Sequence, residues 1–441
     1  DPYYILVVIY IFFPYFSTQV VGDPVYGQAL IGYLNAVSGA LLALTIPFLG
    51  AIADKQGRRK PWIAGTVMFM SIGACMLWWV MPGAHGSDLY WTFLLLLLIN
   101  LAFAYSEVFH NAMLPSITPA NRAGLVSGLA FSLGNLGGVS LMVFVLFAFA
   151  LPGVETWSFL PDQPLWGIDQ AAHEQDRIVG PISGLWMLVF TLPLLFFTPD
   201  TPSSGLTLVS AARSGLKDVF KTISQLKHYA NIGRYLLARM LFNDGMVGVL
   251  IFGGVYAAGN FNWDTISLLI FGLCTSVSAM LGAYLGGRLD DRFGSLATLK
   301  ISVLMTFFIL LALVSIETDR VAFFITVDVA PVWSFPYFST QAEIIYFCVN
   351  QVFALFFVTA LSASRTLMAK ICPPEKAAQF FGLYGLSGSV TAFLAPLLVA
   401  TTTQWFDSQR VGFGSLALLI VLGAGMLLWV SDERTLAPTE D

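Results

Sequence analysis

The stretch GAIADKQGRRK at Gly50–Lys60 decides the fold, because it recurs as GGRLDDRFG at Gly286–Gly294. The two stretches align at a constant offset that matches Asp54 with Asp291, and each lies between two long apolar runs. Duplicated halves of a membrane transporter carry equivalent loops on the same membrane face, whereas a soluble fold has no need of such a repeat. The repeat therefore predicts a membrane transporter built from two similar halves.

The composition also predicts a membrane protein. Hydrophobic residues make up 57% of the chain and charged residues 11%, whereas a typical soluble domain carries roughly 25% charge. The net charge of −5 is small and spread out, so we expect no nucleic-acid partner. The four cysteines show no paired spacing, so we expect no disulfide framework, no metal site and no cofactor. No phosphate-binding glycine loop, HExxH motif or Ser-His-Asp arrangement occurs, so the sequence does not indicate an enzyme or an ATP-driven pump.

Long apolar runs give the number of membrane spans. A helix needs about 20 apolar residues to cross the hydrocarbon core. We predict twelve spans, at residues 3–21, 27–53, 62–81, 90–114, 123–151, 179–198, 234–258, 264–288, 297–316, 343–369, 377–405 and 411–430. Lys and Arg are concentrated in alternate loops, which the positive-inside rule assigns to the cytoplasm. Both chain termini and both charged stretches are therefore expected on the cytoplasmic side.

A turn-rich segment separates the first six spans from the last six. We expect an N-terminal six-helix bundle at 1–198, a cytoplasmic linker at 199–233 and a C-terminal six-helix bundle at 234–441. The linker has the pattern of a basic amphipathic helix, which lies either on the inner leaflet or against the underside of the bundle. A second internal match, Ile117–Gly128 with Ile371–Gly382, indicates that the two halves are parallel repeats.

Several motifs carry a resemblance to a known family. The charged stretch between the second and third spans resembles the cytoplasmic loop motif of the major facilitator superfamily. More narrowly, the chain resembles the bacterial relatives of the autophagy-linked vacuolar amino-acid effluxers, in motifs at Phe109–Pro115, Ala238–Gly245, Gly253–Gly259, Gly287–Arg292 and Phe380–Gly388. The resemblance covers nearly the whole chain. It implies an all-α polytopic membrane protein with the major facilitator fold, in which twelve transmembrane helices form two six-helix bundles.

For function, the resemblance implies secondary transport by alternating access. The substrates that it implies, from the eukaryotic branch of the family, are small amino acids. It also implies a location in the inner membrane of a bacterium. Family members carry an Asp-Trp-Ala stretch just before the first span. That stretch is absent here, and we expect natural sequence to precede Asp1.

Ionisable side chains inside predicted spans are the candidates for chemistry, since a charge at the bilayer centre costs at least about 2.5–3.5 kcal/mol. Glu107, His110 and Asn111 in the fourth span are spaced i, i+3 and i+4, which places them on one helix face. Asp244 in the seventh span and Arg365 in the tenth complete the substrate and proton-coupling candidates. A carboxylate binds well to Arg and an ammonium group to Glu or Asp, so this set favours a zwitterionic solute. Symmetry between the halves predicts that Glu107 and Arg365 line one central cavity.

Each candidate has a second interpretation. Arg365 either binds substrate or closes the cytoplasmic gate, and Asp244 is either functional or structural. His110 either couples transport to protons or is a neutral, hydrogen-bonded histidine. Arg239 lies about 7.5 Å inside the seventh span, where a structural role is favoured. It points about 140° away from Asp244, so we expect these two residues to have different partners.

The charged stretches supply a second class of candidates. The gate or structural charge candidates are Asp54, Arg58, Arg239, Asp291 and Arg292. A carboxylate beside the exposed N–H groups of a helix start is stabilising by about 0.3–1 kcal/mol. We therefore expect Asp54 to contact the start of the eleventh span at Glu375–Ala378, and Asp291 to contact the fifth span at Asn121–Gly124. Such contacts would hold the cytoplasmic side closed.

Small residues indicate close helix packing. Gly282 and Gly286 share one face of the eighth span, and we interpret this face as a contact within the bundle, so we expect a monomer. The sequence as a whole predicts a secondary transporter of a small polar or zwitterionic solute in a lipid bilayer, with proton coupling as a hypothesis. Two alternatives stay open. One is export of an amphiphilic or drug-like compound, and the other is a non-transporting sensor on the same scaffold.

Overall fold

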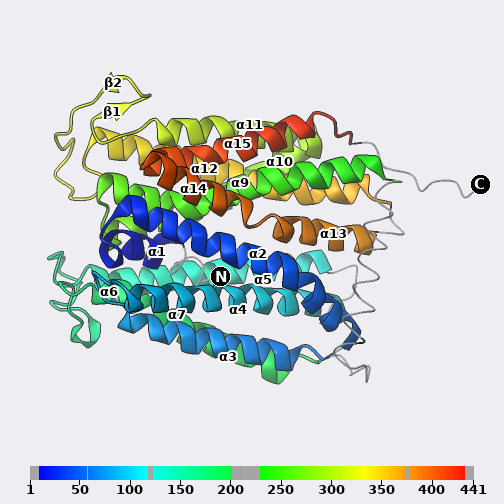
Figure 1. Cartoon of the computed structure of the whole chain (residues 1–441), viewed down its shortest axis with the longest axis horizontal. Coiled ribbons are helices and arrows are strands. Elements are labelled where there is room, and N and C mark those ends of the chain that lie inside the picture. The colour runs from blue at the N-terminus through cyan, green and yellow to red at the C-terminus, as the bar shows by residue number, and fades with distance from the viewer. Residues whose placement is uncertain are drawn as a thin grey trace, which may run out of the picture. The chain divides into compact units, whose positions relative to one another are not determined.

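The chain divides into two compact units (Figure 1). The first unit comprises Asp1–Val219 together with Asp264–Leu269, and the second comprises Phe220–Trp263 together with Ile270–Asp441. The amphipathic helix expected in the linker lies outside the described residues. The computed structural model describes residues 9–56, 58–117, 123–200, 210, 229–373 and 377–432.

Helices form most of the described part of the first unit. Its helical elements are α1 (Phe12–Tyr15), η2 (Phe16–Val20), α2 (Pro24–Gln56), α3 (Lys60–Met76), η3 (Leu77–Trp79), α4 (Ser87–Ile117), α5 (Ala123–Val145), η5 (Leu146–Ala150), η6 (Leu165–Gly167), α6 (Glu174–Arg177) and α7 (Val179–Phe197). Of these, η2 and η5 are π-helices, and η3 and η6 are 3-10 helices. α3 packs against both α4 and α7, and α2 packs against α4. Ile63, Val67, Phe109 and Met113 form a buried apolar cluster at the α3–α4 contact.

The second unit is also helical, with one short hairpin. Its elements are α9 (Ala230–Phe261), α10 (Thr265–Phe293, whose residues up to Leu269 belong to the first unit), α11 (Ser295–Val314), β1 (Arg320–Val321), β2 (Ile325–Thr326), α12 (Gln341–Ile371), α13 (Ala377–Val390), α14 (Leu394–Phe406) and α15 (Gln409–Leu427). α9 packs against α15 and α13, and α11 packs against α12. The two strands are antiparallel, with Arg320 opposite Thr326.

Eleven helical segments among the described residues are long and apolar enough to cross a membrane. They confirm the predicted all-α membrane fold. Four of these segments each combine two helical elements, namely α3 with η3, α5 with η5, α6 with α7 and α13 with α14. The first predicted span, residues 3–21, lies partly outside the described residues, and its described part contains α1 and η2.

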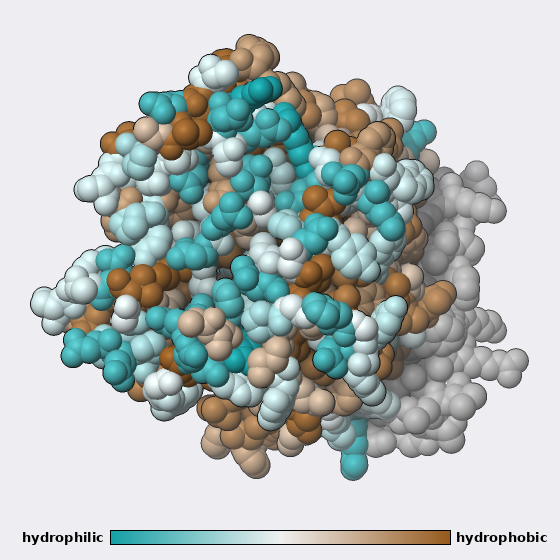
Figure 2. Space-filling view, turned by 60° about the vertical axis from the view of Figure 1, so that its left-hand side comes forward, coloured by the Kyte–Doolittle hydropathy of each residue, from teal (hydrophilic) through white to brown (hydrophobic). Residues whose placement is uncertain are grey.

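Large apolar side chains are exposed along the spans. Phe196 and Phe197 at the end of α7 are 74% and 86% exposed, and Phe308 of α11 is 53% exposed. On the side that carries the loops, hydrophobic residues are mixed with hydrophilic ones (Figure 2). Extensive apolar exposure is a liability in water, whereas lipid tails solvate it. The surface is therefore that of a protein surrounded by lipid.

Gly282 and Gly286 bring α10 close to α12, as their spacing predicts. A Cβ added at Gly282 would lie 2.5 Å from the backbone oxygen of Leu355, and one added at Gly286 would lie 2.9 Å from Cα of Thr359. Thr359 Oγ1 also donates a hydrogen bond to the Gly282 oxygen at 2.9 Å. The predicted contact within the bundle is confirmed.

A capping box fixes the start of α12. The Thr340 hydroxyl accepts from the Glu343 N–H at 3.3 Å, and the Glu343 carboxylate accepts from the Thr340 N–H at 2.9 Å. The other carboxylate oxygen of Glu343 accepts from Trp263 Nε1 at 2.9 Å. Because Trp263 lies between α9 and α10, one carboxylate links that turn to the start of α12.

The eleventh predicted span, 377–405, is broken into α13 and α14 (Figure 1). Pro396 explains the break, because proline has no N–H and its ring clashes with the carbonyl four residues earlier in an α-helix. The chain tightens at the break, where the Leu394 N–H donates to the Thr391 oxygen at 2.8 Å. The sequence carries this signal in a single residue, and the hydrophobic pattern alone does not reveal it.

Candidate functional site

One face of α4 presents two of the predicted site residues. On the opposite side of the helix, Tyr105 Oη is hydrogen-bonded to Thr45 Oγ1 of α2 at 2.8 Å, and Phe109 stacks on a tryptophan of α3 at 5.3 Å between ring centroids. Glu107 and His110 are exposed, and at about 100° per residue they share a face turned away from these contacts. Neither forms a hydrogen bond or an ion pair with any described residue.

Arg365 of α12 is exposed in the same way, without a hydrogen bond or ion pair to a described residue. Its neighbour Ser364 is buried and hydrogen-bonds to two tyrosine hydroxyls, so α12 faces its own unit at Ser364 and not at Arg365. The side chain of Asn111 lies outside the described residues. Glu107 and Arg365 belong to different units, so their expected common cavity stays a prediction.

Arg239 of α9 is buried and bound within the second unit. Its Nη1 donates to the backbone oxygen of Tyr384 at 2.8 Å and to Ser387 Oγ at 2.7 Å, both on α13. The guanidinium carbon lies 3.7 Å from the centroid of the Tyr384 ring, within the range of a cation–π contact. These contacts support the structural interpretation of Arg239.

Asp244, five residues further along α9, is also buried. Its Oδ2 accepts from the backbone N–H of Ala395 in α14 at 3.1 Å. Among the described residues, no cation lies within 4 Å of the Asp244 carboxylate, and no carboxylate lies within 4 Å of the Arg239 guanidinium. The expectation that Arg239 and Asp244 have different partners is confirmed.

In the second charged stretch, the engaged carboxylate is Asp290. Asp290 is buried, and Lys370 Nζ lies 3.2 Å from its Oδ1 and 2.7 Å from Ser295 Oγ. The predicted residues Asp291 and Arg292 are exposed. Asp290 follows Gly286 by four residues, so it lies on the same α10 face that contacts α12. The four-residue spacing from Gly286 could have identified Asp290 from the sequence, whereas the alignment of the two charged stretches pointed to Asp291.

In the first charged stretch, Arg58 is exposed and the side chain of Asp54 lies outside the described residues. The contacts expected for Asp54 and Asp291 involve segments outside the described residues and stay predictions. Asp200 was not predicted to act here. Its carboxylate accepts from the N–H groups of Arg59 at 3.0 Å and Lys60 at 3.3 Å, at the start of α3.

A polar cluster precedes α7 in the first unit. His173 Nδ1 lies 3.1 Å from Asp176 Oδ2, and Thr265 Oγ1 donates to the other carboxylate oxygen. The hydrogen bond to Asp176 raises the pKa of His173 above its usual value, against the opposing effects of burial and of the nearby Arg177 charge. Arg177 itself is buried and pairs with Glu174 at 3.3 Å. None of these residues was among the predicted site residues.

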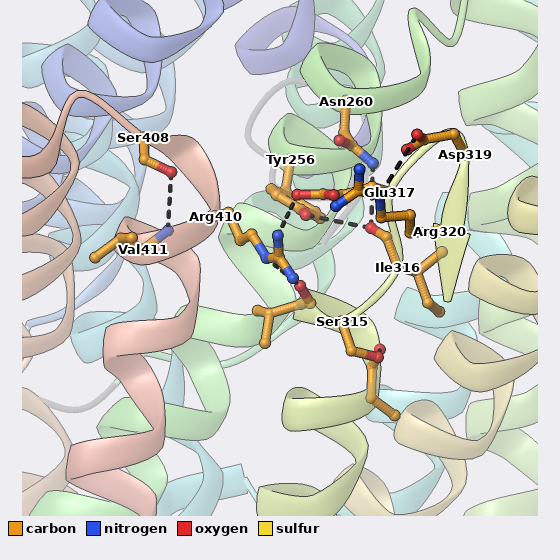
Figure 3. A network of polar contacts seen from close by, with 12 residues as sticks. Tyr256, Asn260, Ser315, Ile316, Glu317, Asp319, Arg320, Ser408, Arg410 and Val411 are labelled. Atoms are coloured by element: carbon orange, nitrogen blue, oxygen red, sulfur yellow. Dashed lines mark hydrogen bonds and ion pairs between the residues drawn. The ribbon is translucent and has the colours of Figure 1, made fainter. Parts of the chain in front are cut away.

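A second polar network lies at the loop ends of the second unit (Figure 3). Arg410 at the start of α15 forms an ion pair with Glu317, and its Nε donates to the Val314 oxygen at 2.7 Å. Asn260 Nδ2, near the end of α9, donates to the Ile316 oxygen at 3.4 Å. The network joins the ends of three helices, α9, α11 and α15, so its role is structural.

The exposed groups on the spans have chemistry suited to transport. A carboxylate beside an imidazole can bind and release protons, and a guanidinium can bind a carboxylate through two hydrogen bonds. Among the described residues, no group of three or more His, Cys, Asp or Glu has the arrangement of a metal site.

Residues 17–438 match the family described as vacuole effluxer Atg22 like. The chain belongs to this family. The MFS-type transporter YxiO of Bacillus subtilis is 26% identical to this Atg22-like chain over 415 residues, which are 92% of the chain and 86% of YxiO. Autophagy-related protein 22-1 of Neosartorya fischeri is 22% identical over 319 residues, 70% of the chain and 48% of that protein. The chain thus spans about half the length of this fungal relative.

Solved structures show the fold of this Atg22-like protein. A D-xylose-proton symporter is similar with a TM-score of 0.65 and 14% identity, over 98% of this chain and 96% of the other. A bacterial homologue of the lysosomal transporter Spinster is similar with a TM-score of 0.61 and 17% identity, over 96% and 95%. At these identities the similarity shows the major facilitator fold alone. With the family match, it identifies the chain as a membrane transporter of the MFS type.

Proposed function

We propose that this chain is a secondary active transporter that moves a small zwitterionic, amino-acid-like solute by alternating access. The observation that carries the proposal is the exposed Glu107–His110 face of α4, which has no partner among the described residues. A charge inside a span is costly, so an uncompensated one is expected where water, protons or solute reach it. The resemblance to vacuolar amino-acid effluxers supports the substrate class.

In this proposal the two charged ends of the solute bind different residues. Arg365 holds the carboxylate, because its planar guanidinium can donate two parallel hydrogen bonds. Glu107 attracts the ammonium group, and Asn111 on the same face of α4 supplies a neutral hydrogen-bonding group. Each part of this assignment can be tested with a separate variant.

Proton coupling is assigned first to Glu107 and His110. Protonation of Glu107 removes a charge that is costly to move through a low-dielectric environment, so it favours reorientation of the carrier. Asp244 is the second candidate, because its buried carboxylate accepts a single hydrogen bond from Ala395. A histidine with a near-neutral reference pKa is suited to passing the proton on.

The charged stretches complete the proposal. Asp54, Arg58, Asp291 and Arg292 act at the cytoplasmic gate. We further propose a monomer in the bacterial inner membrane with both termini in the cytoplasm, built from bundles at 1–198 and 234–441 that the 199–233 linker joins. Alternate loops that concentrate Lys and Arg support this orientation.

The test is solute flux in proteoliposomes under an imposed pH gradient. A labelled amino acid is competed with unlabelled amino acids, with their amides and with their decarboxylated amines. We expect amino acids to compete far better than either analogue, since each analogue lacks one of the two charges. Equal competition by all three classes would contradict a zwitterion site and favour amphiphile export. Absence of any flux would favour a sensor.

A further inference from the structure

Arg239 and Asp244 contact the eleventh span on the two sides of its break. Arg239 donates to Tyr384 and Ser387 in the last turns of α13, and Asp244 accepts from Ala395 in the first turn of α14. Both residues lie on α9, a continuous helix of 32 residues. One unbroken helix therefore holds both halves of a broken one.

The signs of the two charges match the helix ends that they contact. The C-terminal end of a helix carries a partial negative charge and the N-terminal end a partial positive charge. The break places the C-terminal end of α13 next to the N-terminal end of α14 within a membrane span, where unpaired backbone groups are costly. The cation Arg239 contacts α13 at Tyr384 and Ser387, in its C-terminal half, and the anion Asp244 contacts the first turn of α14, so the sign of each charge suits the helix end that it approaches.

The break also explains why Asp244 is needed. In a continuous helix the Ala395 N–H would donate to the Thr391 oxygen four residues earlier. Here that oxygen accepts from Leu394 at 2.8 Å, and the Asp244 carboxylate accepts from Ala395 instead. The Thr391 hydroxyl donates to the Met240 oxygen of α9 at 3.2 Å, so the turn between α13 and α14 is also attached to α9.

Gly388 makes room for the arginine. A Cβ added at Gly388 would lie 3.1 Å from Arg239 Nη1. The guanidinium therefore fits closely over α13 because a residue without a side chain stands at this position.

We propose that Arg239 and Asp244 form a charge clamp that sets the angle between α13 and α14, and that the break at Thr391–Phe393 is a hinge. In this role both are positioning residues and do not contact the solute. The inference concerns the internal geometry of the second unit, so it holds or fails independently of the identity of the solute and of proton coupling through Glu107 and His110.

The test measures the distance between spin labels on the two halves of the span. Phe381 of α13 and Leu397 of α14 are 38% and 39% exposed, so cysteines at these positions can be labelled after the four native cysteines are replaced. Double electron–electron resonance in lipid then reports the distribution of α13–α14 distances. We expect a single narrow distribution in the parent protein.

Asp244→Leu removes both the charge and the hydrogen bond. We expect it to increase the population of a second α13–α14 distance about 5- to 30-fold, the factor that corresponds to one or two kcal/mol. Asp244→Asn, which keeps an acceptor for Ala395, should give a smaller increase, and Arg239→Met should resemble Asp244→Leu. Arg234→Gln, which removes an exposed arginine of the same helix, is the matched control and should leave the distribution unchanged.

An unchanged distribution in Asp244→Asn and Arg239→Met, in protein that keeps its helical circular dichroism, would overturn the clamp. Equal broadening in the Arg234→Gln control would also overturn it, because the effect would then not depend on contact with the eleventh span. Asp244→Asn keeps the side-chain volume, so the comparison survives if Asp244→Leu does not fold.

Discussion

α4 and α9 each carry a carboxylate inside a membrane span, and the two carboxylates have opposite surroundings. Glu107 of α4 is exposed and has no partner among the described residues, whereas Asp244 of α9 is buried and accepts a hydrogen bond from α14. The arginines repeat the contrast, since Arg365 is exposed and Arg239 is bound to α13. A charge in a span is thus not by itself a sign of function. We propose that a charge inside a span is functional where its own unit leaves it unpaired.

The largest expected effect is that of Glu107→Gln. We expect the variant to lose solute accumulation driven by a pH gradient and to keep its thermal stability, because the side chain has no partner to lose. Asp244→Asn should instead lose stability, because its carboxylate holds the Ala395 N–H of α14. Uptake in proteoliposomes and thermal unfolding in detergent, measured on both variants, check the pair. If Glu107→Gln accumulates solute normally, the contrast between the two carboxylates has no functional meaning.

The next effect concerns Arg365. Arg365→Ala should weaken solute binding by about 1.5–3 kcal/mol, the contribution of hydrogen bonds to a charged group. Arg365→Lys should lose less, because a point charge replaces the paired donors. Titration of the purified protein with the transported amino acid measures both. Equal losses in Lys and Ala variants, with unchanged solute selectivity, would instead indicate a gate residue.

Two adjacent glycines of α10 allow the same comparison between a residue that contacts another helix and one that does not. Gly286→Ala should destabilise the protein by about 1–3 kcal/mol, because the new Cβ meets the α12 backbone and forces it to shift. Gly287→Ala should be close to neutral, since a Cβ there has no neighbour within 4 Å among the described residues. Denaturation midpoints of the two variants give the comparison. Similar midpoints would mean that α10 and α12 are not in close contact.

The smallest effect concerns His173, which lies in the polar cluster before α7. The raised pKa of His173 means that its bond to Asp176 contributes stability fully below about pH 6.5, the ordinary histidine value. That contribution is lost as the pH rises through the raised pKa. His173→Gln should therefore flatten the fall of the melting temperature above pH 6.5. The effect is small because the His173 side chain is 32% exposed. A parallel pH profile for wild type and His173→Gln would rule out this contribution.

The sequence predicts the broad architecture well, because span length and charge asymmetry act at the scale of whole helices. The contact of Gly282 and Gly286 with α12 was also predictable, because close approach of two helix backbones requires small residues at helical spacing. The matching of Asp54 with Asp291 assigns a position in the repeat. It does not reveal that Asp290, one residue away, is the carboxylate that pairs with Lys370.

The candidate site was predictable only in part. Glu107 and His110 share a face of α4, as their spacing predicts, because helix periodicity fixes that relation locally. Whether a charged residue has a partner depends on contacts far away in the sequence. Asp244 meets Ala395, Arg59 meets Asp200 and Asp176 meets Thr265, and no local pattern encodes these pairs. Pro396 is the exception, since one residue both breaks the eleventh span and exposes the N–H that Asp244 accepts.

The carboxylate of Glu343 gives the second unit an order of assembly. Trp263 enters the membrane with the early helices of the unit, about 80 residues before the ribosome supplies Glu343. Until then the indole N–H of Trp263 lacks its acceptor, and water or lipid head groups must satisfy it. The carboxylate that caps the start of α12 is therefore also the acceptor that Trp263 needs, so the capping of α12 and the pairing of Trp263 depend on the same side chain. A substitution at Glu343 would act first on the nascent chain, at the moment when the later helices dock against the earlier ones.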